Sequence, residues 1–470
     1  MPSLAQIVEK YAARVTVRRP GDPAANGRCV VYWMQRAQRA LDNPALDLAV
    51  ELANALELPC IVFFAPVPFY PHANLRHYRF LQQGIPDTAA RCEKRNIGFV
   101  LRRYPDHSLL SFCDEVKAAL VVGDENPLRE PRSWREKAAK RLRVPLYTVD
   151  ADVIVPTRLL QKEQYAARVI RPRIQSYLEQ YLTPSEEPRA RFSWDTPRGV
   201  QSLDTSFDIT ENWKDLDRSV APVDSFTGGT SHGLALLRAF TEKKLANYPE
   251  KHSQANMDGT SRLSPYLHFG HLGPATIALA VKNAKASSKA KEDYLDQLIT
   301  WRELSTCFVH YNEFYDSIEC AEPWAHKTLA AHAKDRRHVL YTRQQLECAD
   351  THDELWNAAQ KQMLHTGWMH NYMRMYWAKK MLEWSPSPSA AYNTAVYLND
   401  KYFLDGRDPN GYAGVSWSIV GKFDRPWFDR PIFGLIRYMA ESGAKKKFDT
   451  AKYIAQMNEL AGEEQPRRFV

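Results

Sequence analysis

The chain of 470 residues carries 63 Lys and Arg against 55 Asp and Glu, which gives a formal net charge of +8. This length predicts two or three domains, and the charge favours a polyanionic partner such as nucleic acid, although a merely basic enzyme would show the same balance. Seven cysteines without CxxC spacing argue against a disulfide framework and a zinc ribbon, and no metal site is predicted. The sequence shows neither a signal-peptide core nor an apolar run near the ~20 residues of a spanning helix, so we expect an intracellular protein that does not enter a membrane.

The first ~150 residues alternate short apolar runs with helical patterns, as in an α/β unit. Strands are expected at residues 29–34, 60–64, 98–101, 120–122 and 145–149, and helices at 44–56, 109–118 and 133–142, with a further long helix before Gly98. This spacing predicts a doubly wound, Rossmann-like parallel sheet, in which ligands lie beyond the C-terminal ends of the strands. The turn after the first strand reads Trp33-Met34-Gln35-Arg36, so a GxGxxG dinucleotide site is excluded, and no P-loop occurs.

A polar stretch with repeated Pro and Gly, from Thr183 to about Gly229, predicts a connector between domains. Helical patterns dominate the rest of the chain. Helices are expected at 234–245, from 264 onward, at 274–285 and 293–311, and at least twice within 351–384, with an interruption near Gly367. The predicted division is therefore an α/β domain at 1–182, a connector at 183–230 and an all-α domain at 231–470.

The segment 365–384 is the most informative part of the sequence. It has a helical pattern and combines many Trp, Tyr and Met residues with basic ones, including Lys379 and Lys380. Trp377 and Trp384 are seven residues apart, so they share one helical face. An aromatic ladder on a basic helix is typical of a protein that moves electrons or stacks on bases.

Two shorter motifs each allow a chemical and a structural interpretation. Thr260-Ser261-Arg262-Leu263-Ser264-Pro265 sets three hydroxyls and a guanidinium ahead of a helix, which predicts either an anion cradle or an ordinary helix cap. Gln297, Trp301 and Ser305 are spaced by four, so a helix would present an amide and a ring on one face. A Trp packed in the core is the alternative.

Two segments near the C-terminus are rich in polar and aromatic residues. Residues 399–411 are expected to form a turn-rich loop whose Asp, Arg and Asn side chains read the edge of a heterocycle, or a solvated turn. Gly414-Val415-Ser416-Trp417 and residues 422–427 interleave basic residues with rings. Nucleic-acid grooves use this combination, and so do packed tryptophans beside surface charges.

In this order, the motifs together resemble those of the photolyase/cryptochrome flavoproteins. Residues 374–380, Asp408-Pro409-Asn410-Gly411-Tyr412 and Ala413-Gly414-Val415-Ser416-Trp417 resemble the class II cyclobutane pyrimidine dimer photolyases in particular, and residues 165–172 resemble their domain connector. The likeness covers nearly the whole chain. It implies an α/β domain followed by an all-α domain that binds FAD, and light-driven repair of pyrimidine dimers in DNA by an electron from excited, reduced FAD.

The resemblance also implies roles for individual residues. FAD would contact Tyr248, Thr260, Ser261, Leu263, Ser264, Arg302, Arg374, Asn399, Asp405 and Arg407, with Asn399 near N5 of the flavin. The flipped-out dimer and its DNA would contact Gln297, Trp301, Met375, Trp417, Asp424 and Arg425. Trp356, Trp377 and Trp384 would carry the electrons that reduce the flavin under light. An antenna chromophore, a deazaflavin or a folate, would lie in the α/β domain. The expected partner is dimer-containing DNA, bound by a monomer in the cytoplasm at the nucleoid, or in the nucleus of a eukaryote.

One position departs from the family pattern. The family normally has a glutamate that hydrogen-bonds the dimer where this chain has Gln297. An amide donates a hydrogen bond but cannot supply a proton. Repair remains the expected function because the stacking tryptophans and the DNA loop match. The alternatives are a cryptochrome-like blue-light photoreceptor without efficient repair and a basic nucleic-acid-binding protein without a cofactor.

Overall fold

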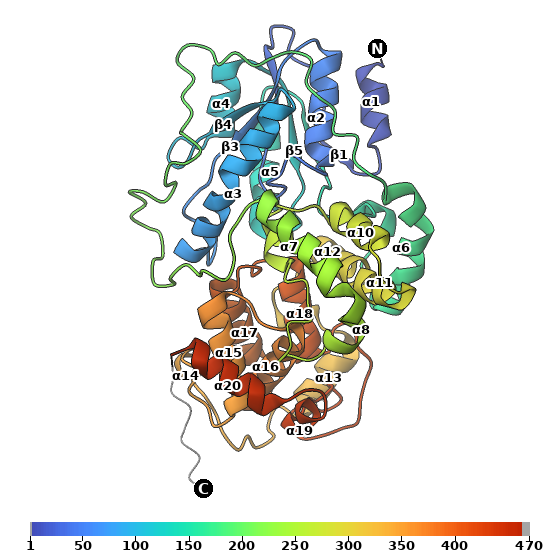
Figure 1. Ribbon diagram of the computed structural model, residues 1–470, viewed down its shortest axis with the longest axis vertical. Coiled ribbons are helices and arrows are strands. Elements are labelled where there is room, and N and C mark those ends of the chain that lie inside the picture. The colour runs from blue at the N-terminus through green and yellow to red at the C-terminus, as the bar shows by residue number, and fades with distance from the viewer. Residues whose placement is uncertain (1, 463–470) are drawn as a thin grey trace.

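The computed structural model describes residues 2–462 and sets an α/β unit above a larger helical unit in the view of Figure 1. The α/β unit is built on a six-stranded sheet with the order β1-β6-β5-β2-β3-β4. The pairs among β2 to β6 are parallel, and β1 joins β6 antiparallel. The strands are β1 (Val15–Arg19), β2 (Cys29–Trp33), β3 (Cys60–Phe64), β4 (Gly98–Leu101), β5 (Ala118–Asp124) and β6 (Leu146–Val149). The predicted parallel sheet is confirmed.

Successive residues of the central strand β2 point into two separate cores. Val30 and Tyr32 belong to the apolar cluster that includes α2, whereas Cys29 and Val31 belong to the cluster that includes α4. Because both faces of the strand are buried, its sequence is apolar without alternation. The helices of this unit are α1 (Leu4–Lys10), α2 (Pro44–Ala55), α3 (Leu75–Lys94), α4 (Leu109–Val116) and α5 (Arg129–Arg141).

The second unit is built from helices and irregular segments, and its described residues contain no strand. Its longest rod joins α11 and α12 through η3, a π-helical segment. The longer elements are α6 (Ala167–Tyr181), α7 (Thr230–Lys243), α10 (Pro274–Asn283), α11 (Ser288–Leu295), η3 (Asp296–Trp301), α12 (Arg302–Tyr311), α13 (Pro323–Ala331), α15 (Glu354–Thr366), α16 (Asn371–Trp384), α17 (Pro388–Tyr402), α18 (Pro409–Val420) and α20 (Thr450–Leu460). The short ones are η1 (Thr157–Leu160), η2 (Leu245–Asn247), α8 (Tyr248–Lys251), α9 (Ser264–His268), η4 (Ile318–Cys320), α14 (Arg343–Glu347) and α19 (Glu441–Lys445).

The connector between α6 and α7 contains no helix and no strand. It is nevertheless packed, because Ile209, Trp213 and Leu216 bury their side chains in the core of the α/β unit. Figure 1 shows this green trace running back over the α/β unit before α7 begins. Apolar anchors of this kind hold an irregular segment in one path without backbone ladders.

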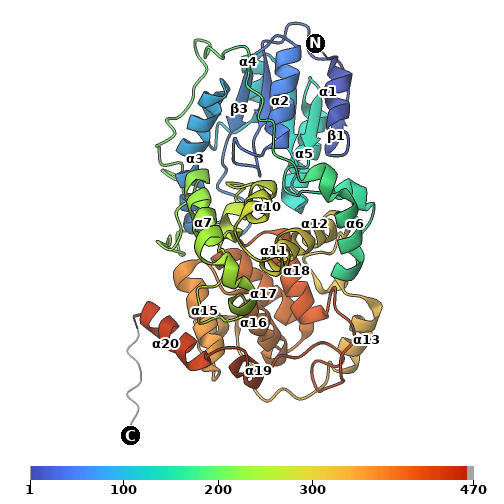
Figure 2. The same ribbon diagram turned by 45° about the vertical axis from the view of Figure 1, so that its right-hand side comes forward.

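α6 packs mainly with the helical unit, although the guanidinium of Arg14, next to β1, lies 5.5 Å from the ring centre of Tyr181. Ile154, Ile170 and Ile174 lie in the same apolar cluster as Leu237 and Phe240 of α7. Figure 2 shows α6 beside the rod of α11 and α12. We propose that the packing boundary of the α/β unit lies soon after β6. The division expected at residue 182 instead follows the end of α6, and the end of the expected all-α domain, residues 463–470, lies outside the described residues.

Several local expectations differ from the structure. β1 and α1 arise from the basic N-terminal segment, for which no element is expected. The segment 399–411 is irregular only at residues 403–408, because α17 continues to Tyr402 and Pro409 begins α18.

Within residues 2–462, no helix combines the length and the apolar character needed to cross a membrane.

Candidate functional site

A cavity of about 320 Å³ opens in the helical unit among α9, η3, α16, α17 and α18, and we call it the helical cavity. It brings together residues as far as 170 positions apart in the sequence, from Tyr248 to Ser418. All of the expected FAD contacts except Arg407 line it, namely Tyr248, Thr260, Ser261, Leu263, Ser264, Arg302, Arg374, Asn399 and Asp405. Gln297, Met375 and Trp377 line it as well.

Hydroxyl groups form one part of the cavity wall. Thr260 and Ser261 precede the turn into α9, and Ser261 Oγ accepts a hydrogen bond from the Tyr294 hydroxyl at 3.0 Å. Arg262 adopts a left-handed φ of 54°, and its guanidinium packs 5.1 Å from the centre of the Trp368 ring. The reversal of the chain at this residue leaves hydroxyls and backbone groups along the wall. Such groups suit phosphate and ribose oxygens.

Arg262, Arg302 and Arg374 line the cavity, and the last two are each held by a buried aspartate. Arg374 Nη2 lies 2.9 and 3.0 Å from the two carboxylate oxygens of Asp405, and its guanidinium lies 3.9 Å from the Phe403 ring centre. Arg302 donates through Nε to the backbone oxygen of Asp152 at 3.0 Å and pairs with its carboxylate at 3.3 Å. Pairing is what makes charges tolerable at this depth. The cavity wall therefore presents charged groups in fixed orientations, which suit a planar ligand with polar atoms along its edge.

Asn399 closes another part of the wall. Its Nδ2 donates to Asp400 Oδ1 at 2.8 Å. A Cβ at Gly411 would lie 2.8 Å from the same nitrogen, so glycine is needed there for α18 to approach α17. Arg407 does not reach this wall, because its Nη1 donates to the Asp400 carbonyl at 2.6 Å and meets the His77 ring. It lies instead on a second cavity.

The π-helical segment η3 separates two residues that are expected to share a face. Gln297 is exposed and lines the cavity, whereas Trp301 is half-buried and lies outside the lining. The side chain of Trp301 hydrogen-bonds Asp296, which is paired with Arg171 at 2.8 Å. A π-helical turn contains more residues than an α-helical one, so the spacing of four no longer aligns side chains. Segments of this kind are frequent at functional sites.

Three tryptophans lie in series behind the cavity wall. The rings of Trp377 and Trp356 are parallel, with centroids 6.4 Å apart and 8° between their planes, and Trp356 meets Trp384 at 5.7 Å and 68°. The indole N–H of Trp356 donates to the backbone oxygen of Trp377 at 2.9 Å, and that of Trp377 donates to Gln360 at 2.8 Å. All three rings are buried. They form a rigid aromatic path that begins at the cavity.

Trp417 lies next to the cavity on α18, with a buried lysine against its ring. Lys379 Nζ lies 4.5 Å from the ring centre and donates to the backbone oxygen of Ser418 at 2.9 Å. Burial lowers the pKa of Lys379 to about 7, with Asp424 acting to raise it and Arg437 to lower it. The aromatic helix is therefore not a basic surface at this position. Its lysine points inward, beneath Trp417.

A ladder of cations and rings continues from Trp417 to the surface. Arg437 lies 5.7 Å from the Trp417 ring centre and 4.5 Å from that of Trp427, which Arg425 approaches at 5.2 Å. Asp424 Oδ1 accepts from the indole N–H of Trp427 at 3.3 Å. The neighbouring Phe428 is 86% exposed. We call residues 417, 424, 425, 427 and 437 the aromatic–basic ladder; its two rings are half-buried, and rings beside guanidinium groups suit nucleic acid.

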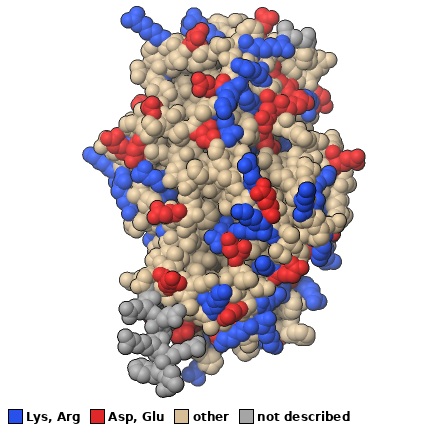
Figure 3. Space-filling view, viewed as in Figure 1, with Lys and Arg blue, Asp and Glu red and all other residues tan. Residues whose placement is uncertain are grey.

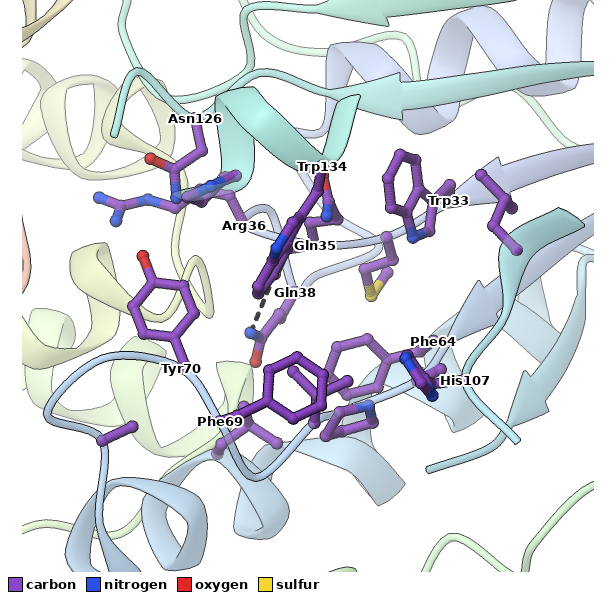
Figure 4. A pocket seen from close by; sticks show the side chains of 18 of the residues that line it. Trp33, Gln35, Arg36, Gln38, Phe64, Phe69, Tyr70, His107, Asn126 and Trp134 are labelled. Carbon is purple, nitrogen blue, oxygen red and sulfur yellow. Dashed lines mark hydrogen bonds between the residues drawn. The ribbon is translucent and has the colours of Figure 1, made fainter. Parts of the chain in front are cut away.

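A second cavity, of about 400 Å³, lies beyond the C-terminal ends of β2 and β3, and we call it the α/β cavity. Figure 4 shows Trp33, Phe69, Tyr70 and Trp134 around this space, with polar groups such as Gln35 among them. Its position agrees with the ligand position expected for a doubly wound sheet. The turn that follows β2, which lacks the glycine fingerprint, forms part of its wall.

Arg36 joins the walls of the two cavities. It lines the α/β cavity, and its Nη2 lies 2.6 Å from Asp408, which lines the helical cavity. Its Nε lies 2.6 Å from Asp152, the partner of Arg302. His268 Nδ1 lies 3.1 Å from Asp408, and burial lowers the pKa of His268 to about 4. Sequence reasoning misses this network because Arg36 and Asp408 are 372 positions apart.

Known proteins share both the sequence and the fold. The family model described as DNA photolyase matches residues 30–189. A deoxyribodipyrimidine photo-lyase from Methanothermobacter thermautotrophicus is 41% identical over 456 residues, which cover 96% of this chain and 100% of the relative. The chain belongs to the DNA photolyase family. A deoxyribodipyrimidine photo-lyase from Oryza sativa subsp. japonica is 38% identical and covers 99% of this chain and 94% of its own length. The resemblance and the enzyme class predicted for this photolyase-family chain are thereby confirmed.

Solved structures of low sequence identity confirm the fold of this photolyase-family chain. A Synechocystis cryptochrome superposes with a TM-score of 0.72 at 15% identity, covering 92% of this chain and 89% of that one. A class III photolyase from Agrobacterium tumefaciens gives 0.68 at 18% identity, with 94% of each chain covered. One of these two neighbours is a cryptochrome and the other a photolyase, so the fold is compatible with either activity.

Proposed function

We propose that this chain repairs cyclobutane pyrimidine dimers in DNA with light absorbed by FAD in the helical cavity. The observation that carries the proposal is the position of Trp377. It lines the same cavity as the Arg374–Asp405 pair and stacks on Trp356, so a flavin held by the pair would adjoin an aromatic path. The activity places the protein with DNA inside the cell, at a nucleoid or in a nucleus.

The residues of the helical cavity suit the parts of FAD. The cavity volume is within the ~300–1,000 Å³ usual for cofactor sites. The hydroxyls of Thr260, Ser261 and Ser264 are donors for phosphate and ribose oxygens, and Arg302 adds a positive charge near the proposed position of the flavin ring. Arg374, Asp405 and Asn399 provide the donors and acceptors that the edge of the flavin ring needs, with Asn399 proposed to face N5. The tight contact of Gly411 with Asn399 would keep that amide in place.

When bound and reduced, FAD supplies the excited electron that splits the dimer. The chain's own contribution is orientation and electrostatics. In the Arg374–Asp405 pair, a half-buried guanidinium donates through Nη2 to both oxygens of a buried carboxylate, so the pair is oriented before light is absorbed and little solvent must reorganise around it. Met375 is half-buried on the same helix and lines the cavity, where it would exclude water from the reacting pair.

The proposed dimer site adjoins the aromatic–basic ladder. Trp301 and Trp417 would stack on the flipped-out dimer, and the exposed amide of Gln297 would donate to a pyrimidine carbonyl. Damaged bases stack and pair poorly, so extruding them costs less than extruding a normal pair. Figure 3 shows Lys and Arg spread over the face among acidic side chains. Contact with phosphates is proposed to depend on the loop that contains Asp424 and Arg425.

Two further roles complete the proposal. Trp377, Trp356 and Trp384 would pass electrons toward the helical cavity when the flavin is oxidised, because parallel or edge-on rings at 6.4 and 5.7 Å form a continuous path. The α/β cavity would hold an antenna chromophore, and its aromatic walls suit the planar rings of a deazaflavin or a folate.

The alternative is a cryptochrome-like photoreceptor, which Gln297 favours because an amide cannot supply a proton. Both functions predict a yellow protein with a flavin absorption spectrum. They differ when reduced protein is illuminated with dimer-containing DNA. Restored thymines support repair, and photoreduction without restored thymines, with equal affinity for damaged and intact DNA, supports the photoreceptor. A colourless pure protein without flavin absorption would contradict both.

A further inference from the structure

Two rings beyond Trp384 continue the aromatic path to the surface. Tyr341 meets Trp384 edge-on, with ring centroids 5.4 Å apart and 78° between planes, and His352 lies 5.3 Å from Trp384 at 62°. Tyr341 and His352 are stacked on each other at 5.9 Å and 20°. The backbone N–H of Tyr341 donates to the backbone oxygen of Trp384 at 3.1 Å. The last buried tryptophan is therefore in contact with a phenol and an imidazole.

The phenol of Tyr341 is hydrogen-bonded to a base. Its oxygen accepts from the backbone N–H of His352 at 2.9 Å and lies 2.6 Å from Nδ1 of the same residue. With the backbone donor already in place, the phenol proton is directed to Nδ1, and the second imidazole nitrogen carries the ring proton. A phenol gives up an electron easily only when its proton leaves with it, and this geometry provides the acceptor.

We propose that Tyr341 is the terminal electron donor of the tryptophan path and that His352 accepts its proton. This inference rests on the electron-supply role proposed for Trp356, Trp377 and Trp384. The oxidant is the light-excited, oxidised flavin, which acts through the tryptophans. In the step itself, the Trp384 radical cation gains one electron from Tyr341 and becomes neutral. The O–H bond of Tyr341 breaks, its proton goes to Nδ1 of His352, and a neutral tyrosyl radical and an imidazolium remain.

Burial and charge favour the transfer in this direction. Trp384 is buried, whereas Tyr341 is half-buried and His352 is exposed, so a soluble thiol can reach the tyrosyl radical and restore the phenol. Lys380 Nζ lies 5.5 Å from the Trp384 ring centre, where its charge opposes positive charge on that ring. Its pairing with Glu383 at 2.8 Å offsets part of this field. The oxidising equivalent is therefore held more stably on Tyr341 than on Trp384.

The test is flash photolysis of the purified holoenzyme with oxidised FAD and without DNA, followed by transient absorption and electron paramagnetic resonance. In the parent, a tryptophan radical should appear first and a tyrosyl radical should replace it. Tyr341→Phe should lose the tyrosyl signal and speed up charge recombination severalfold. His352→Phe, which retains an aromatic ring, should leave the tryptophan radical and lose most of the tyrosyl signal.

Tyr402→Phe is the matched control. The hydroxyl of Tyr402 donates to Glu347 at 2.6 Å, so this phenol also has a proton acceptor, but its ring packs against Arg76 and Lys401. This variant should behave as the parent. A parent that forms a tryptophan radical but no tyrosyl radical, or a tyrosyl signal that survives Tyr341→Phe, would overturn the inference and leave the tryptophan path intact. A parent with no tryptophan radical would contradict the electron-supply proposal itself, and the role of Tyr341 with it.

Discussion

Trp377 and Trp356 lie face to face, with 6.4 Å between their ring centroids and 8° between their planes, and only Trp377 of the two lines the helical cavity. This relationship distinguishes two proposed activities that would use the same flavin. Electron supply to an oxidised flavin would pass through Trp377, whereas dimer splitting by an already reduced flavin would not. The two can therefore be measured independently.

Trp377→Phe should block photoreduction of oxidised flavin and leave repair by chemically reduced enzyme largely unchanged. Phenylalanine is much harder to oxidise than tryptophan, and it keeps most of the ring contact with Trp356. The measurement is flavin bleaching under blue light, with repair assayed separately on pre-reduced protein. Trp194→Phe, in the connector, is the control and should photoreduce normally. Equal photoreduction in Trp377→Phe and the parent would refute the role of Trp377.

Trp417→Ala should weaken binding of dimer-containing DNA by roughly 1–3 kcal/mol, the contribution of one stacking contact. Binding to intact duplex should change little, because a flipped-out base is needed for the contact. Fluorescence anisotropy with matched damaged and intact oligonucleotides measures both. Arg425→Ala is the complementary variant. It should weaken both DNAs alike and reduce the salt dependence by about one phosphate contact. A loss in Trp417→Ala that is the same for both DNAs would argue against stacking on the dimer.

Gln297→Glu should raise the yield of repaired dimers per absorbed photon, because a carboxyl group can supply a proton as well as a hydrogen bond. Gln297→Leu removes the donor and should weaken dimer binding by about 0.5–1.5 kcal/mol, the net worth of one hydrogen bond. Actinometry with a dimer-containing oligothymidine gives the yield, and titration in the dark gives the affinity. An unchanged yield in the glutamate variant would mean that the amide already suffices for repair.

The buried amine of Lys379 should make stability depend on pH. Burial lowers its pKa from 10.5 to about 7, so between these values the unfolded chain binds a proton that the folded chain does not. Unfolding free energy should therefore rise with pH in this window, by up to about 1.4 kcal/mol per unit, and stay flat below pH 7 for this group. Urea denaturation of the parent and of Lys379→Met from about pH 6 to about pH 10 isolates the contribution. A constant difference between the two proteins would show that the amine does not titrate there.

The sequence predicts the parts of this molecule that depend on local pattern. Apolar runs identify all five parallel strands, and Asn43 with Pro44 marks the start of α2 because both act within one turn. Contacts between distant positions remain hidden. The pairing of Arg36 with Asp408 and the burial of Lys379 under Trp417 depend on tertiary packing. Arg36, Asp408 and Lys379 are of charged residue types that usually lie at the surface. Their burial is tolerated only because each has a partner in the folded chain.

Gln297 and Trp301 show a second limit of sequence reasoning. Their spacing of four predicts one shared face, but the π-helical segment η3 rotates one relative to the other. No residue type in η3 predicts the π-helical geometry, because its sequence is compatible with a regular α-helix. The segment 399–411 differs from the predicted turn-rich loop for a simpler reason. Asn399 and Asp400 still satisfy helical hydrogen bonds in α17, and the chain leaves the helix only at Phe403.

Light-dependent repair by the reduced protein tests the central claim most directly. Purified protein with chemically reduced FAD is mixed with dimer-containing DNA, illuminated with blue light, and the restored thymines are measured against a dark control. The account predicts multiple turnovers in the light and none in the dark, at full rate in Trp377→Phe as well as in the parent. Intact dimers after illumination of protein that carries reduced flavin and binds the damaged DNA would contradict it.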